Sequence, residues 1–309
     1  MAFLFTSPGL RGVGDALFVS ALARLLRNRR PLAPLAVQSQ QYSLFLNSPD
    51  VDIVICGYGD SRRDCKLVRR ETRRLPQIVG YRWALSWAVR DVGLVGRGRN
   101  AHHGWPPKKP LLVETAECAA APLTDQERRA LRPWFFPLRW ELEEWSHLRG
   151  AICIQSTAAT YWTPNKQWVA DRWEAVARWL GGRYRLVQLG DEVDAPLSCD
   201  VDLRGKTDIR GAGAVLAGAR LFVGMEGGLM HLARAVETRS AIVFTGFISP
   251  EFSGYPENEN VYRPDVGHET PCWRREPCEC RCAENVEAKD VVAACEAALA
   301  RGQLEGRWT

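Results

Sequence analysis

The chain has 309 residues, of which 46% are hydrophobic and 25% charged, and its formal net charge is +5. This composition is typical of a folded globular protein, and the length predicts two domains rather than one. No apolar run approaches the ~18 residues that a membrane-spanning helix needs, and no basic region opens a signal peptide, so a cytoplasmic protein is expected.

The first half of the chain alternates short apolar runs with helical periodicity, which indicates strand–helix units on a parallel sheet. Strands are predicted at residues 3–6, 35–38 and 51–55, and a helix over 15–29. The region 105–145 is rich in Pro and Trp and is predicted to be irregular, except for a short helix that the capping box Thr124–Glu127 begins.

A second strand–helix series opens at Ala151 and repeats the pattern of the first. It comprises predicted strands at 151–155, 185–189, 221–223 and 241–245 and helices at 169–180, 212–217 and 229–236. We therefore predict two doubly wound, Rossmann-like domains, residues 1–148 and 149–309, with a ligand at the carboxyl ends of their strands. A last helix over 286–300 is expected to pack back across the domain junction.

Basic side chains concentrate in residues 61–100, which hold eleven Lys and Arg against three acidic residues. Such a segment fits an anionic partner, either a phosphorylated acceptor or a membrane surface that the protein contacts peripherally. A solvated, arginine-rich helix face explains it equally well. No nucleic-acid motif accompanies the charge, so we expect no nucleic-acid partner.

Three strand-to-helix turns carry residues suited to anion chemistry. The first, residues 9–15, is rich in glycine and ends at Asp15, which is interpreted either as a general base or as a helix N-cap. The second, residues 156–168, offers Lys166 as a point charge for a phosphate or as a plain loop lysine. In the third, residues 222–231, adjacent glycines open a helix whose first N–H groups suit a diphosphate.

Together these turns resemble the bacterial heptosyltransferase family, the family 9 glycosyltransferases of the GT-B fold. Gly14-Asp15-Ala16-Leu17 is similar to the family's Gly-Asp-Val-Leu opening, and Asn165-Lys166-Gln167-Trp168 to its Lys-x-Trp loop. The stretch 224–231, Gly-Met-Glu-Gly-Gly-Leu-Met-His, is similar to its Asp-(Ser/Thr)-Gly-x-x-His signature.

The resemblance implies an inverting transfer of a sugar, heptose favoured, from a nucleotide-diphosphate donor such as ADP-heptose to a hydroxyl, as in lipopolysaccharide biosynthesis. Asp15 would be the catalytic base, and no catalytic cofactor is expected. The acceptor would be an anionic glycan, a glycolipid or a protein. The donor-binding residues would be Thr157, Lys166, Glu226, Gly227, Gly228, Leu229, Met230 and His231.

Two positions depart from the family pattern. Glu226 stands where the family has Asp. The family's ribose-binding Glu is matched to Arg210, which cannot accept hydrogen bonds from ribose hydroxyls, with Asp208 nearby as a substitute. The donor base and sugar therefore stay open at this point.

Four of the ten cysteines lie close together near the C-terminus, as Cys272, Cys278, Cys280 and Cys282. Their spacing is tighter than that of an ordinary zinc site. A structural zinc or iron and free thiols are both compatible with it, and relatives that glycosylate autotransporter proteins bind a structural metal in this region.

Two other functions compete with the transferase hypothesis. One is a GT-B-type sugar-nucleotide epimerase, which would need further acid–base groups in the cleft. The other is a non-catalytic nucleotide-sugar-binding module. A classical dinucleotide dehydrogenase is disfavoured, because the glycine spacing in residues 9–14 does not match the phosphate-binding fingerprint.

Overall fold

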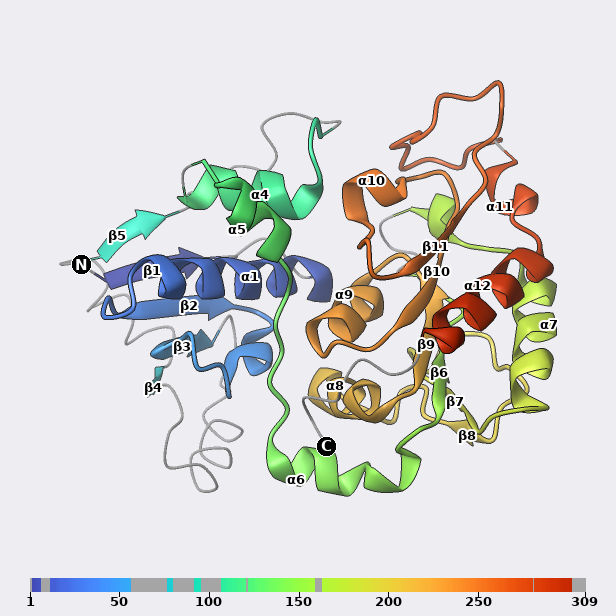
Figure 1. Ribbon diagram of the computed structural model, residues 1–309, viewed down its shortest axis with the longest axis horizontal. Helices are drawn as coiled ribbons and strands as arrows, with labels where there is room; N and C mark the ends of the chain where they lie inside the picture. Colours follow the sequence, from blue (N-terminus) through green and yellow to red (C-terminus); the bar gives the residue numbers. More distant parts are fainter. Residues whose placement is uncertain are drawn as a thin grey trace. The chain divides into compact units, whose positions relative to one another are not determined.

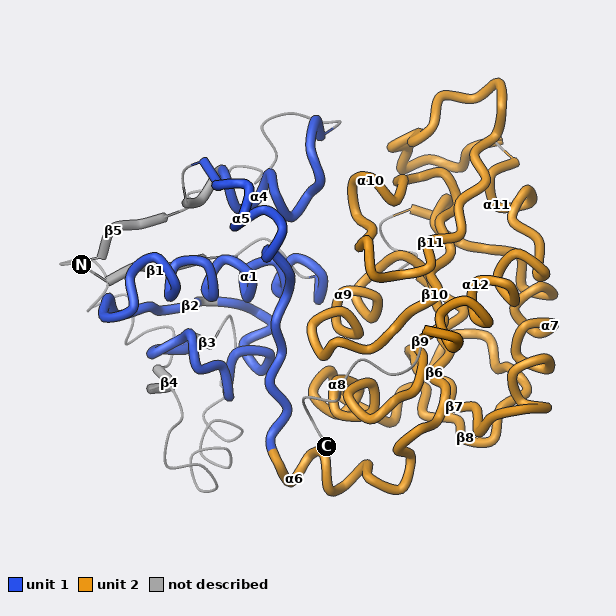
Figure 2. The backbone as a smooth tube through the Cα atoms, in the orientation of Figure 1, with its two compact units in different colours: residues 1–138 blue, residues 139–309 orange. Residues whose placement is uncertain are grey.

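The computed structural model describes residues 2–6, 12–56, 77–79, 92–95, 107–120, 122–158, 163–279 and 281–301. The chain divides into two compact units, residues 1–138 and 139–309 (Figure 2). This boundary precedes helix α6 (Arg139–Glu144), whereas the sequence placed it after residue 148. The reason is that α6 packs against α8 (Ile209–Gly218) and so belongs to the second unit.

The first unit is built on a parallel sheet of five strands in the order β4-β3-β2-β1-β5 (Figure 1). Helix α1 leaves the sheet after β1, buries an almost continuous apolar face that includes Leu17 and Leu22, and packs against α4. The elements are β1 (Ala2–Thr6), α1 (Val13–Arg29), β2 (Leu35–Ser39), η1 (Tyr42–Phe45), β3 (Ile53–Cys56), β4 (Gln77–Val79), β5 (Val92–Val95), α4 (Leu111–Ala120) and α5 (Asp125–Ala130).

The second unit has a parallel sheet of six strands in the order β11-β10-β9-β6-β7-β8. After α6 come η2 (Ser146–Leu148), β6 (Ile152–Ile154), η3 (Pro164–Lys166), α7 (Ala170–Gly181), β7 (Leu186–Gln188) and β8 (Val201–Asp202). Then follow α8, β9 (Leu221–Met225), α9 (Gly228–Ala235), β10 (Ser240–Phe244), α10 (Pro250–Ser253), β11 (Glu259–Tyr262), α11 (Cys282–Asn285) and α12 (Ala288–Ala300).

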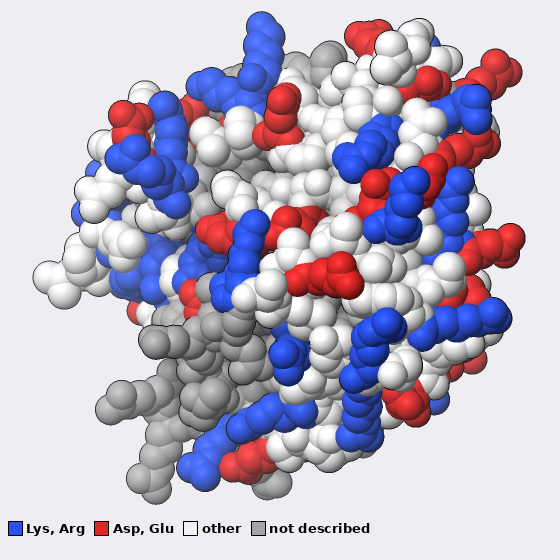
Figure 3. Space-filling model, turned by 45° about the vertical axis from the view of Figure 1, so that its right-hand side comes forward, with Lys and Arg blue, Asp and Glu red and all other residues white. Residues whose placement is uncertain are grey.

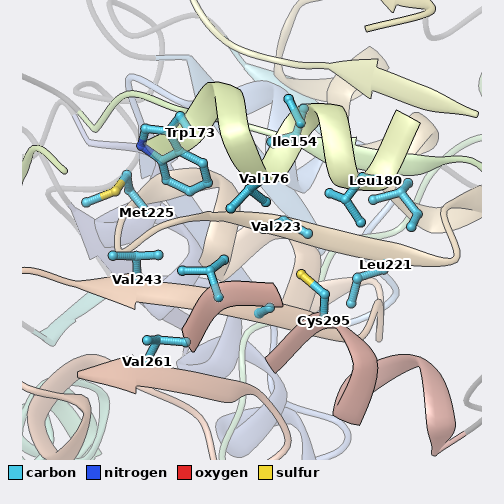
Figure 4. Close-up of a cluster of buried hydrophobic side chains, with 14 of the residues drawn as sticks. Ile154, Trp173, Val176, Leu180, Leu221, Val223, Met225, Val243, Val261 and Cys295 are labelled. Carbon is cyan, nitrogen blue, oxygen red and sulfur yellow. The ribbon is translucent and has the colours of Figure 1, made fainter. Parts of the chain in front are cut away.

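Helices cover both faces of this sheet: α8 and α9 lie on one side, and α7 and α12 on the other (Figure 1). The central strands β6 and β9 are fully buried, as parallel strands between two helix layers must be. Their side chains form a core with Trp173 and Leu180 of α7 and Cys295 of α12 (Figure 4). This core fixes the carboxyl ends of β6, β9 and β10, where the candidate site lies.

The predicted fold class, α/β with Rossmann-like parallel sheets in both halves, is confirmed. Three details differ. Helix α4 lies in the region that was predicted to be irregular, the edge strands β4, β5, β8 and β11 were not predicted, and α12 packs on the sheet of its own unit. Edge strands as short and only partly buried as β8 and β11 give weak sequence signals.

Charged side chains on the face shown in Figure 3 are interspersed by sign. The basic segment 61–100, for which an anionic partner and a solvated helix face were both predicted as possible explanations, lies outside the described residues apart from the backbone of β4 and β5. None of the helices in the described ranges is long and apolar enough to cross a membrane.

Candidate functional site

The candidate site lies at the carboxyl ends of β6, β9 and β10 in the second unit. In open parallel sheets this edge is where ligands bind, because the loops there lead from strands into helix N-termini. The loop after β6 is closed on itself by Gln167, whose side-chain amide donates to the carbonyl of Ala158 (2.8 Å) and accepts from its N–H (3.2 Å). That closure brings η3, with Lys166 at its end, over the sheet edge.

An ion pair joins the loops after β6 and β9: Lys166 Nζ contacts Glu226 Oε2. The two side chains are only 18% and 6% exposed, so little water screens the pair. The other carboxylate oxygen, Oε1, accepts a hydrogen bond from Ser253 Oγ (2.6 Å). The Lys166 ammonium also lies 5.3 Å from the centroid of the Phe247 ring, on the loop after β10. Three loops therefore meet at Lys166.

The electrostatics keep the Glu226 carboxylate charged. Its burial opposes the charged form, but the Lys166 ammonium and the hydrogen bond from Ser253 outweigh this, and the pKa of Glu226 lies below its ordinary value. The site thus contains a fixed cation and a fixed anion. A phosphate bound there would meet the ammonium of Lys166 together with backbone dipoles.

Those dipoles come from the start of α9. Gly227 is the N-cap, and the first N–H to bond within the helix belongs to His231, which donates to the Gly227 carbonyl (3.2 Å). The N–H groups of Gly228, Leu229 and Met230 precede it and have no partner inside the helix. A Cβ on Gly227 would meet no atom of the described residues within 4 Å, so the part of the chain that the structure describes leaves open space at this N-cap. The Met230 side chain is fully buried.

His231 is a buried, neutral side chain. Burial and the nearby Lys166 charge lower its pKa to about 4, although Glu226 acts in the opposite direction. Its Nδ1 is hydrogen-bonded to the hydroxyl of Tyr255 (2.7 Å), and burial raises the pKa of that hydroxyl. His231 therefore fixes the start of α9 to the segment after α10 and carries no charge at neutral pH.

The acidic loop after β7 adjoins the loop after β6. Thr157 donates a hydrogen bond to the Asp194 carboxylate, and burial raises the pKa of Asp194. Thr157 thus lies beside the site as predicted, but its hydroxyl is engaged with a carboxylate. In a Rossmann-like domain, the acidic residue that contacts a ribose follows the second strand. In this unit the second strand is β7.

Arg210, which the sequence matched to the ribose-binding position, pairs with an acidic residue of another helix. Its guanidinium forms a bidentate, buried pair with Glu141 of α6, at 2.5 Å (Nε–Oε1) and 2.7 Å (Nη2–Oε2). Asp208 is also occupied, because it caps α8 by accepting from the N–H of Gly211 (2.7 Å).

Asp15 lies in the first unit, in the first turn of α1, and is partly exposed. The N-cap of this helix is Gly12, so the interpretation of Asp15 as an N-cap is wrong. A Cβ on Gly12 would come within 2.9 Å of Asp15 Oδ2. The missing side chain at Gly12 therefore makes room for the Asp15 carboxylate.

The described cysteines do not form a metal centre. Cys272 and Cys278 are neighbours, and burial with the nearby Cys278 thiol raises the pKa of Cys272. Cys282 is buried and close enough to Cys272 to raise the pKa of that thiol. Its Sγ accepts from the N–H of Asp265 (3.2 Å) and packs against Gly246, where a Cβ would lie 2.6 Å from it. Within the described ranges no group of three or more His, Cys, Asp or Glu could hold a metal ion, and Cys280 lies outside them.

Comparison with known proteins gives a family match and similar folds. Residues 139–281 match the model of glycosyltransferase family 9 (heptosyltransferase). The Escherichia coli ADP-heptose lipopolysaccharide heptosyltransferase II has a TM-score of 0.63 at 18% identity, over 97% of this chain and 99% of that one. A family 9 glycosyltransferase from Veillonella parvula has a TM-score of 0.66 at 13% identity, over 97% of each chain.

A third similar structure is the iron-containing dodecameric glycosyltransferase TibC of enterotoxigenic E. coli (TM-score 0.64, 15% identity, 97% of this chain and 76% of that one). No curated protein matches the sequence. The fold is the parallel α/β architecture of GT-B enzymes, and the family match supports a glycosyltransferase. The family match itself lies in the second unit, where residues 139–281 match glycosyltransferase family 9, the heptosyltransferase family.

Sequence reasoning did not find Ser253, Tyr255 and Phe247, which contact Glu226, His231 and Lys166. All three lie between β10 and β11, in a stretch without a recognisable motif. The one available signal was the loss of helical and strand periodicity directly after a buried strand, the position where binding loops occur.

Proposed function

We propose that this protein transfers heptose from ADP-heptose to a hydroxyl of an anionic glycan, glycolipid or protein acceptor, with inversion at the anomeric carbon. The observation that carries the proposal is the pairing of Lys166 with Glu226, which directly precedes Gly227, the N-cap of α9. The name of the similar heptosyltransferase II includes ADP-heptose as its donor, and Arg210, paired with Glu141, gives no reason to expect another.

The diphosphate of the donor would bind at the α9 N-terminus. Its oxygens would accept from the N–H groups of Gly228, Leu229 and Met230 and from Lys166 Nζ. Charge grows on the diphosphate as the bond to the anomeric carbon breaks. Fixed donors aimed at that charge stabilise the transition state more than the ground state, and removing one of them typically costs ~10²–10³ in rate.

The ribose of the donor would face the loop after β7, near Asp194 and Thr157. This places the nucleoside on the β7 side of the sheet edge and the phosphates over β9, in agreement with the strand order β9-β6-β7. Carboxylate oxygens accept hydrogen bonds from ribose hydroxyls, which a guanidinium cannot do.

Asp15 would act as the general base. Near the N-terminus of α1 the helix dipole stabilises its ionised form by roughly 0.3–1 kcal/mol. It would accept the proton of the acceptor hydroxyl while that oxygen attacks the anomeric carbon on the face opposite the leaving ADP, which inverts the configuration. No residue in this scheme needs a cofactor, since proton transfer and charge stabilisation are supplied by side chains and backbone amides.

The test is Asp15→Asn with ADP-heptose as donor and heptose-free lipopolysaccharide as acceptor. We expect turnover, measured as ADP release, to fall by ~10²–10⁴ while ADP-heptose affinity stays within about twofold. The anomeric configuration of the product, read by NMR, reports inversion. Wild-type turnover in Asp15→Asn, or a product with retained configuration, would refute the mechanism.

A further inference from the structure

The cysteine-rich segment (residues 271–282) is attached to the loop that carries Lys166. The residue that attaches it is Asn165, directly before Lys166. Its Nδ2 donates to the carbonyls of Arg274 (2.8 Å) and Glu276 (2.7 Å), and its Oδ1 accepts from the N–H of Cys278 (2.8 Å). One side chain thus fixes three backbone groups of this segment next to Lys166.

The segment is also attached to the loop after β10. The N–H of Cys272 donates to the carbonyl of Gly246 (2.9 Å), and the N–H of Trp273 to that of Phe247 (3.2 Å). Trp273 has a left-handed backbone (φ 54°), which is uncommon for a residue other than glycine. Backbone conformations of this kind persist where the surroundings over-determine them, and they concentrate at ligand sites.

The Trp273 ring stands in an aromatic group beside the lysine. It meets Phe247 and Phe252 edge to face, with centroid distances of 6.0 and 5.1 Å. Phe247 in turn lies under the Lys166 ammonium. Trp273 and Phe252 both remain partly exposed, whereas Phe247 is buried beneath them. A flat aromatic surface is therefore accessible one ring away from the ammonium.

The strand order says which part of the donor reaches this surface. Along the edge β7-β6-β9-β10, the nucleoside is proposed at β7 and the diphosphate at β6 and β9. The glycosyl group is attached to the far phosphate, so it extends towards β10, where Phe247 and Trp273 lie. A sugar ring carries C–H groups on its faces, and these pack against aromatic rings while its hydroxyls point aside.

We infer that Trp273 is a specificity-determining residue whose ring packs against the transferred sugar of the donor, and that Asn165 is the residue that positions it. This inference rests on the proposed function, because it takes the diphosphate to bind beside Lys166. It predicts that Trp273 contributes to the binding of a nucleotide sugar and leaves the binding of the nucleotide alone unchanged.

The experiment compares two ligands, ADP and ADP-heptose, by isothermal titration calorimetry on the full chain. Trp273→Leu keeps apolar bulk and removes the flat ring, and Trp273→Phe keeps a smaller ring. The matched control is Trp179→Ala on α7, a partly buried Trp whose ring stacks under Arg183 (4.6 Å). Thermal melts of each variant report that the second unit is folded.

For Trp273→Leu we expect ADP-heptose affinity to fall about tenfold, the range of an aromatic stacking contact, with ADP affinity within twofold of wild type. Trp273→Phe should lose less, and Trp179→Ala nothing. Equal affinity of wild type and Trp273→Leu for ADP-heptose would overturn the inference, as would an equal loss for both ligands. A wild-type protein that binds neither ligand would overturn the proposed function and this inference with it.

Discussion

Glu226 Oε1 accepts a hydrogen bond from Ser253 while its Oε2 contacts the ammonium of Lys166, so one carboxylate joins the loops after β6 and β9 to helix α10. Both side chains of the pair are largely buried, and each partner compensates the charge of the other. In a buried pair the loss of one partner costs more than the pair itself contributes, because a charge is left without compensation.

Glu226→Gln is therefore expected to lower the free energy of unfolding of the second unit by about 2–4 kcal/mol. Urea titrations at pH 7 measure this quantity. The double variant Lys166→Met/Glu226→Gln removes both charges and should recover much of the loss. A cost below about 0.5 kcal/mol for Glu226→Gln would mean that Lys166 is solvated.

Gly12→Ala tests how Asp15 is positioned. The backbone of Gly12 (φ −73°, ψ 139°) suits any residue, but the new methyl group would come within 2.9 Å of Asp15 Oδ2 and displace that carboxylate. We expect the fold to be retained and kcat to fall about 10- to 100-fold, since small misplacements of a catalytic group have effects of this size. Ala at Gly150, where a Cβ meets nothing but φ is positive, is the contrasting control: it should affect stability and spare kcat. An unchanged kcat in Gly12→Ala would mean that the position of Asp15 does not matter for catalysis.

The stability of the second unit should depend on pH through His231. Its pKa is about 4 in the folded state and ordinarily 6.5, so the unfolded state binds more protons between these values. The contribution is present above pH 6.5 and is lost as the pH falls from about 6.5 to about 4, by an amount on the order of 3 kcal/mol. Urea titrations across this window measure it. In His231→Gln the free energy of unfolding should depend less on pH. If it falls as steeply as in the wild type, other groups cause the effect.

Arg210 provides a test of whether this guanidinium takes part in donor binding. Arg210→Ala leaves Glu141 buried without its partner and should cost about 3–5 kcal/mol of unfolding free energy. ADP affinity, measured on the folded variant, should stay within twofold of wild type, because the guanidinium faces α6. A large loss of ADP affinity at unchanged stability would mean that Arg210 contacts the donor.

The sequence predicted the strand–helix units well where burial is strongest. Helix α9 was predicted over 229–236, one residue later than it lies. The prediction came this close because β9 is entirely apolar and the adjacent Gly227 and Gly228 mark the end of that strand. Helix α4 was missed because the prolines before it suggested an irregular chain. Its first turn begins directly after Pro110, whose carbonyl accepts a hydrogen bond from the N–H of Glu114. Proline is well tolerated at the start of a helix.

The candidate site was only partly predictable. Lys166, Glu226 and His231 were chosen from local motifs, and the structure brings them together. The pairing of Lys166 with Glu226 depends on β6 and β9 being neighbours, and the contacts of Tyr255 depend on how the chain folds after β10. Such relationships are set by sheet topology, and no spacing along the chain encodes them. The same holds for Arg210, whose partner Glu141 lies in another helix.

The central claim is that Lys166 and the α9 N-terminus bind the diphosphate of the donor. Calorimetric titration of ADP into wild type and Lys166→Ala measures it most directly, with Lys206→Ala, an exposed lysine bonded to the Asp202 carbonyl, as the control. The account predicts that ADP affinity falls about 10- to 100-fold in Lys166→Ala, the value of a charge-assisted hydrogen bond, and is unchanged in Lys206→Ala. ADP affinities within twofold for all three proteins would contradict it.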